Sequence, residues 1–191
     1  LNSLNKAQKI NPNMSEIHFA KSNLYLKISQ QKNAKNSLET GLKIEPNNHK
    51  AIFQLGNIYL INKNYTQAIN LFDKSVKIKP DFWQAINNKG LAYFEQNNIN
   101  LSIKLFESAI SIQDNAEPLL GLAACLRNKN INLAIELAKK ALAKNHNYVD
   151  YEYRKEQLWG EKLQNSTEIL LQNKKLQKDV ILAKSKIGSS S

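Results

Sequence analysis

Apolar residues along this chain recur three and four positions apart, which is the spacing of one face of an α-helix. Two neighbouring stripes of this kind consist of Leu55, Ile58 and Tyr59, and of Ala68, Ile69, Phe72 and Val76. Each stripe predicts an amphipathic helix of about 13 residues whose apolar side packs against a neighbour. No period shows the strict alternation of a half-buried strand, so the sequence predicts an all-α fold.

The helical pattern repeats at a fixed interval of 34 residues. Three residue types mark the period: Tyr25, Tyr59 and Tyr93; Ile10, Ile44, Ile78 and Ile112; and the helix-ending prolines Pro12, Pro46 and Pro80. Each period contains two helical stripes and therefore predicts one hairpin of two helices. Stacked hairpins of constant length are typical of a solenoid, in which each repeat packs on its neighbours.

The repeated residues resemble the tetratricopeptide repeat motif. Its positions 7, 8, 11, 20, 24, 27 and 32 correspond here to Leu55, Gly56, Tyr59, Ala68, Phe72, Ser75 and Pro80. Small residues at positions 8, 20 and 27 let helices approach closely, and the large residues at 11 and 24 fill the space between them. The resemblance implies a right-handed α-solenoid of tetratricopeptide-type helical hairpins with a C-terminal helical cap.

The resemblance also predicts how the chain is divided. We expect residues 1–14 to form the second helix of a truncated upstream repeat. Four repeats should follow, at 15–48, 49–82, 83–116 and approximately 115–148. Capping helices are expected at 149–187 and a flexible tail at 188–191. A chain that begins in mid-hairpin is expected to be a fragment, and its N-terminal edge could support self-association. After Tyr148 we expect one longer polar helix that includes Leu158 and Trp159, then a shorter helix.

The charged residues of the chain bear on whether it binds nucleic acid. The net charge is +11, and the cations comprise 25 lysines and only two arginines, Arg127 and Arg154. Specific phosphate and base contacts usually favour arginine, and the lysines are spread along the chain, so we expect no specific nucleic acid. Non-specific binding of nucleic acid or acidic protein stays an alternative. No apolar run is long enough to predict a membrane span, and a soluble, cytoplasmic protein is favoured.

The sequence offers no catalytic constellation. The histidines His18, His49 and His146 do not stand at helical spacing from another metal ligand, and the glycines form no phosphate loop. Cys125 lies in an apolar helix, where a small buried hydrophobe is expected and not a nucleophile. We therefore predict no metal, no cofactor and no enzymatic activity.

In proteins of this family the first helix of every hairpin lines a concave groove. The resemblance places these residues there: Phe19, Asn23, Leu26, Phe53, Gln54, Asn57, Leu60, Asn87, Asn88, Leu91, Phe94, Leu119 and Leu126. Aromatic rings would supply contact area and amides would bond a peptide backbone. A terminal-carboxylate clamp is not expected, because Phe19, Gln84 and Asn88 stand where its cations would be. Alternatively, some of these side chains pack against neighbouring helices.

The leading hypothesis is a non-enzymatic protein–protein interaction scaffold that binds a partner peptide in this groove, in the assembly of a larger complex. One alternative is the repeat region of a larger enzyme whose catalytic domain lies upstream. The other is the non-specific binder described above. The sequence does not identify the partner, the pathway or the compartment.

Overall fold

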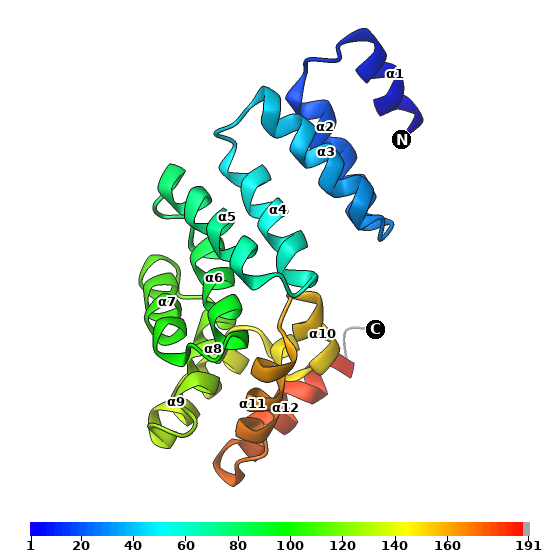
Figure 1. The fold of residues 1–191 in the computed structure, drawn as a ribbon. Helices are drawn as coiled ribbons and strands as arrows, with labels where there is room; N and C mark the ends of the chain where they lie inside the picture. Colours follow the sequence, from blue (N-terminus) through cyan, green and yellow to red (C-terminus); the bar gives the residue numbers. More distant parts are fainter. Residues whose placement is uncertain (189–191) are drawn as a thin grey trace. The chain divides into compact units, whose positions relative to one another are not determined.

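A computed structural model describes residues 1–188 of the chain (Figure 1). All regular elements in this range are helices, which confirms the predicted all-α class. The chain forms two compact units, Leu1–Pro80 and Asp81–Ser191. The tail expected at 188–191 lies outside the described residues, apart from Gly188 at the end of the last helix. No helix in the described range has the length and apolar character needed to cross a membrane.

Unit 1 consists of one leading helix and two hairpins. The leading helix is α1 (Asn2–Ile10), the first hairpin is α2 (Ser15–Lys27) with α3 (Gln31–Ile44), and the second is α4 (His49–Ile61) with α5 (Tyr65–Ile78). The asparagines between elements have a local role. The side chain of Asn48 accepts from the amide of Ala51 at the start of α4, and such side chains stabilise helix N-termini.

The turn inside each hairpin is built the same way in three successive repeats. Ser29, Lys63 and Asn97 have φ values of 58°, 57° and 63° and stand 34 residues apart. The next amide in each case donates to the carbonyl of the repeated tyrosine, at 2.8, 2.9 and 2.8 Å. This bond and the left-handed residue form a Schellman motif, which ends a helix and turns the chain back.

The interior of each hairpin depends on a large residue packed against a small one. Phe72 of α5 is fully buried, and a methyl group added to Gly56 of α4 would lie 2.6 Å from its ring. Phe106 is likewise fully buried, and its ring lies against Gly90 and Gly121. A larger side chain at Gly56 would separate the two helices of its hairpin, so the motif's small residues follow from close packing.

Unit 2 contains two further hairpins and a C-terminal helical segment. Its elements are α6 (Trp83–Glu95), α7 (Ile99–Ile112), α8 (Ala116–Leu126), α9 (Ile131–Lys144), η1 (His146–Val149), α10 (Tyr151–Glu156), α11 (Glu161–Leu171), η2 (Lys174–Leu176) and α12 (Gln177–Gly188). The helix α12 packs against η1 and the second helix α9, whereas α11 packs across the first helices α6 and α8.

The prediction of one longer helix after Tyr148 is wrong. The segment is divided into α10 and α11, with Leu158, Trp159 and Gly160 between them. Leu158 has a φ of 67°, and the amide of Trp159 donates to the carbonyl of Arg154 at 3.1 Å. The turn that ends the first helices of the hairpins thus also ends α10, here with a leucine in the left-handed position.

Candidate protein-interaction site

The candidate groove residues of unit 1 lie on α2 and α4. Two amides join these helices: Gln54 Nε2 donates to Asn23 Oδ1 over 2.8 Å. Asn23 is exposed, and Gln54 and Asn57 are half-buried. The structure therefore brings part of the predicted amide row together at the surface of unit 1, with the cross-helix pair formed by Asn23 and Gln54.

Each predicted aromatic residue of unit 1 lies partly at the surface and partly in the interior. Phe19 and Phe53 are both half-buried. A methyl group added to Gly41 of α3 would lie 2.4 Å from the Phe19 ring, and the Phe53 ring centroid lies 5.8 Å from that of Phe72. Each ring thus packs partly inside its own hairpin, as the alternative interpretation allowed. Leu26 is half-buried and Leu60 is buried.

The candidate groove residues of unit 2 lie on α6 and α8, and most of them are covered. Only Leu126 is half-buried; the buried ones are Asn87, Asn88, Leu91, Phe94 and Leu119. The helix α11 packs across both helices and buries its own Leu163 and Leu170. In this conformation the chain itself therefore occupies the first-helix surface of unit 2.

A carboxylate on α6 fixes the start of α11. Glu95 accepts hydrogen bonds from the backbone amides of Leu163 at 3.0 Å and Lys162 at 3.3 Å, and Lys162 Nζ donates to the carbonyl of Glu95 at 2.6 Å. A carboxylate at a helix N-terminus bonds otherwise unpaired amides and interacts favourably with the helix dipole. A methyl group on Gly160 would lie 2.3 Å from the Glu95 carboxyl carbon, so this contact requires glycine.

The Trp159 side chain is the largest anchor of the covering segment. It is 4% exposed, and its Nε1 donates to Glu117 Oε1 of α8 over 3.3 Å. Burial raises the pKa of Glu117 to about 7, although hydrogen bonds with Asn87, Trp159 and Tyr148 oppose the shift. Farther along α11, Ser166 Oγ donates to the carbonyl of Ala124 at 2.9 Å.

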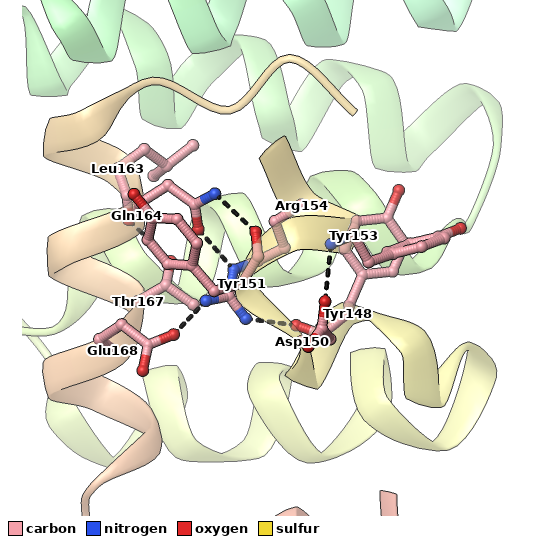
Figure 2. A network of polar contacts seen from close by, with 9 residues as sticks. All are labelled: Tyr148, Asp150, Tyr151, Tyr153, Arg154, Leu163, Gln164, Thr167 and Glu168. Atoms are coloured by element: carbon pink, nitrogen blue, oxygen red, sulfur yellow. Dashed lines mark hydrogen bonds and ion pairs between the residues drawn. The ribbon is translucent and has the colours of Figure 1, made fainter. Parts of the chain in front are cut away.

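A fully buried arginine holds α10 to α11 (Figure 2). Arg154 Nε donates to Gln164 Oε1 at 2.8 Å, Nη1 donates to the Tyr148 carbonyl at 2.7 Å, and Nη2 pairs with Glu168. The planar guanidinium serves three acceptors at once, which a lysine ammonium cannot do in the same geometry. The sequence placed Trp159 in a capping helix and Glu95 on the first-helix face, but it gave no role to Arg154 or Glu117 and did not indicate these contacts. The scarcity of arginine in a lysine-rich chain was the one available signal.

The metal-ligating side chains and the cysteine bear on the question of catalysis. Within the described residues, no group of three His, Cys, Asp or Glu side chains could hold a metal ion. Burial raises the pKa of Cys125 to about 12, so its thiol stays protonated at neutral pH. Its Sγ lies 3.6 Å from Ser102 Oγ. Cys125 thus contributes to packing as a neutral side chain.

Helical hairpins at a constant interval, packed through small residues, define a helical-repeat protein. A family model described as "TPR repeat" matches residues 56–97, and models described as "Tetratricopeptide repeat" match 37–70 and, in two copies, 15–48 and 84–115. The chain belongs to the tetratricopeptide repeat family, which confirms the resemblance seen in the sequence. The hairpin of α8 and α9 lies beyond the matched ranges.

Solved structures show the same fold. A crystal structure of MamA has a TM-score of 0.68 and 21% identity, covering 82% of this chain and 88% of MamA. YrrB, described as a TPR protein with an unusual peptide-binding site, has a TM-score of 0.66 and 15% identity. The match covers 95% of this chain and 97% of YrrB. Thermobaculum terrenum O-GlcNAc transferase has a TM-score of 0.65 and 16% identity, and the match covers 71% of this chain and 27% of the transferase. A comparison with curated proteins finds no match.

Proposed function

We propose that this chain is a non-catalytic scaffold that binds an extended peptide of a partner protein on the first helices of unit 1. The amide pair of Asn23 and Gln54, at the surface of α2 and α4, carries the proposal. Each amide has both donor and acceptor capacity, so the pair can bond a peptide backbone in addition to its own bond. The repeat family supports this role, and YrrB, a protein of the same fold, has an unusual peptide-binding site.

The surroundings of the amide pair favour a peptide with acidic residues. The half-buried rings of Phe19 and Phe53 lie on the same two helices and supply apolar contact area. Lys27 of α2 and Lys50 of α4 are exposed, and the net charge of the chain is +11. A positive surface accelerates encounter with acidic segments and disfavours basic ones.

The test selects peptides from a displayed library against the whole chain and measures their affinity for two variants. In the first variant, Asn23→Ala and Gln54→Ala are combined, and we expect at least tenfold weaker binding. The matched control is Asn70→Ala, which removes an exposed amide from the second helix α5 and should leave affinity unchanged. Selected peptides that bind the double variant as tightly as the wild type would refute the proposed surface.

The second candidate is the repeat region of a larger enzyme. The match to O-GlcNAc transferase covers 27% of that chain, so the same repeat fold can stand within a longer enzyme. Determining the complete reading frame and assaying the full-length product tests this candidate. A catalytic domain on the same chain would support it, and the peptide-binding role of α2 and α4 would then recruit the enzyme's protein substrate.

A further inference from the structure

We infer that residues 158–171 are an intramolecular occupant of a second binding surface, on α6 and α8, and that a partner helix of similar chemistry binds there by displacing them. This inference rests on the proposed function, because it assigns a binding role to first helices in unit 2 as well. Its evidence comes from α11 and the turn before it.

The covered surface is equivalent to the one proposed for binding in unit 1. At the 34-residue interval, Asn87 corresponds to Phe53, Asn88 to Gln54 and Leu91 to Asn57. The helix α11 therefore lies across the helix positions that the repeat leaves accessible in unit 1. The helix α11 extends from α8 of the last hairpin to α6 of the hairpin before it, whereas α12 packs on η1 and α9.

The contacts of this segment resemble those of a bound peptide more than those of a hairpin interior. One buried tryptophan serves as the anchor, and a carboxylate on the receiving surface caps the helix. Hairpin interiors in this chain rest mainly on apolar residues such as Ala34, Leu38 and Phe72, together with small buried serines. Interfaces that open and close are more polar than permanent cores and depend on a few aromatic anchors.

Docking also has unfavourable terms that release would relieve. The carboxyl group of Glu117 is 9% exposed beneath Trp159, and an ionised group is costly to bury. Asn87 Oδ1 meets no donor among the described residues. These features favour a segment that can detach while the hairpins stay folded.

The bound segment indicates what a partner must offer. Trp159 reaches Glu117, Gly160 allows Glu95 to approach, and Leu163 and Ser166 face the receiving helices. We therefore expect the partner to present a helix that begins just after a tryptophan–glycine pair and carries leucine and serine at the same spacing. The corresponding segment of a second copy of this chain has the same chemistry, so exchange between copies is one form that release can take.

The first experiment measures hydrogen exchange in the unmodified chain. If α11 detaches on its own, its backbone amides should exchange at least tenfold faster than those of Leu119–Ala123 in the middle of α8. Equal rates in the two helices would mean that α11 leaves only when unit 2 unfolds. That result would overturn the proposal, whatever the behaviour of any variant.

The second experiment supplies the segment in trans, as a fluorescent synthetic peptide of residues 158–172. A chain carrying Trp159→Ala and Leu163→Ala should bind it at least tenfold more tightly than the wild type, whose tethered segment competes at a high effective concentration. The matched control chain carries Ile181→Ala and Leu182→Ala, two exposed positions of α12, and should behave like the wild type. Circular dichroism verifies that each variant keeps its helical content.

The peptide with alanine in place of tryptophan should bind neither chain. The proposal would be overturned if the variant and the wild type bound the original peptide equally tightly, or if neither chain bound it. A dimer formed by exchange of residues 158–171 between copies would support it, because exchange requires release. Neither experiment involves Asn23 or Gln54, so a failure of this proposal is distinguishable from a failure of the proposed surface of unit 1.

Discussion

Ser29 shows how a single residue sets the turn between two helices, and how the turn can be improved. It is exposed, and its φ of 58° lies in the left-handed region. Glycine adopts this conformation without the steric cost that a β-carbon imposes. We expect Ser29→Gly to raise the free energy of unfolding by about 0.5–1 kcal/mol, measured by urea denaturation.

The control for Ser29→Gly places glycine in a helix. Lys74 is exposed in the middle of α5, so Lys74→Gly should lower the free energy of unfolding by about 0.5–1 kcal/mol. Opposite signs for the two substitutions would show that backbone conformation, and not the loss of a side chain, decides the outcome. A destabilised Ser29→Gly variant would contradict the turn as described.

Glu117 makes the stability of unit 2 depend on pH. Because burial raises its pKa from 4.5 to about 7, the folded chain binds the proton more tightly than the unfolded chain between these values. Stability is therefore greatest below the unfolded pKa and is lost as pH rises through the folded pKa, by on the order of 2–3 kcal/mol. Tyr148, which faces the carboxyl group, has a raised pKa through burial and stays neutral.

The measurement compares free energies of unfolding at about pH 5 and pH 8 in the wild type and in Glu117→Gln. The glutamine cannot ionise, so the pH-dependent difference should largely disappear in the variant. The pKa of Asp114 is lowered by Lys140 and Lys144, so its effect falls below 3.8 and outside this range. An unchanged difference in Glu117→Gln would show that another group causes it.

At the scale of elements, Arg154 joins α10 to α11. Its guanidinium is fully buried and bonds Gln164, Glu168 and the Tyr148 carbonyl. Arg154→Lys keeps the charge but loses the planar fork, and should lower the free energy of unfolding by about 2–4 kcal/mol. The chain contains only one other arginine, Arg127, which is half-buried and donates to Ser166.

Arg127→Lys is therefore the matched control for Arg154→Lys, with an expected loss below about 1 kcal/mol. Urea denaturation of both variants provides the comparison. Hydrogen exchange in the Arg154 variant should rise in α10 and α11 and stay unchanged in α2 and α4, which belong to unit 1. Equal losses in the two variants would contradict the central role of Arg154.

The repeated hairpins could be predicted from the sequence because their information is local. Tyrosine, small residue and proline recur at one interval, and each predicts the packing of its own hairpin. The position of α11 could not be predicted in this way. Its defining contact joins Leu163 to Glu95 across 68 residues, and an apolar stripe on a helix does not reveal which surface it will cover. The Phe19 and Phe53 rings show the same limit, since a first-helix residue can face the surface and its own hairpin at once.

At the scale of the whole molecule, the same repeat fold has one accessible first-helix surface and one that is covered. In unit 1 the amides of α2 and α4 are accessible, whereas in unit 2 the equivalent positions lie under the chain's own α11. The family and the solved structures establish the fold that the two surfaces share. The two surfaces therefore differ in the side chains that they leave accessible.

The net charge of +11 also belongs to the whole molecule, and it predicts weak, non-selective attraction to nucleic acid. Lysines along the chain release counterions when they approach phosphates, so binding to an unrelated duplex should weaken steeply between about 50 and 200 mM salt. Duplexes of different sequence should bind alike, because two arginines provide little base readout. Fluorescence anisotropy over a salt series measures both properties. Tight binding at about 150 mM salt that distinguishes one sequence from another would contradict the prediction and favour nucleic acid over a peptide as the natural partner.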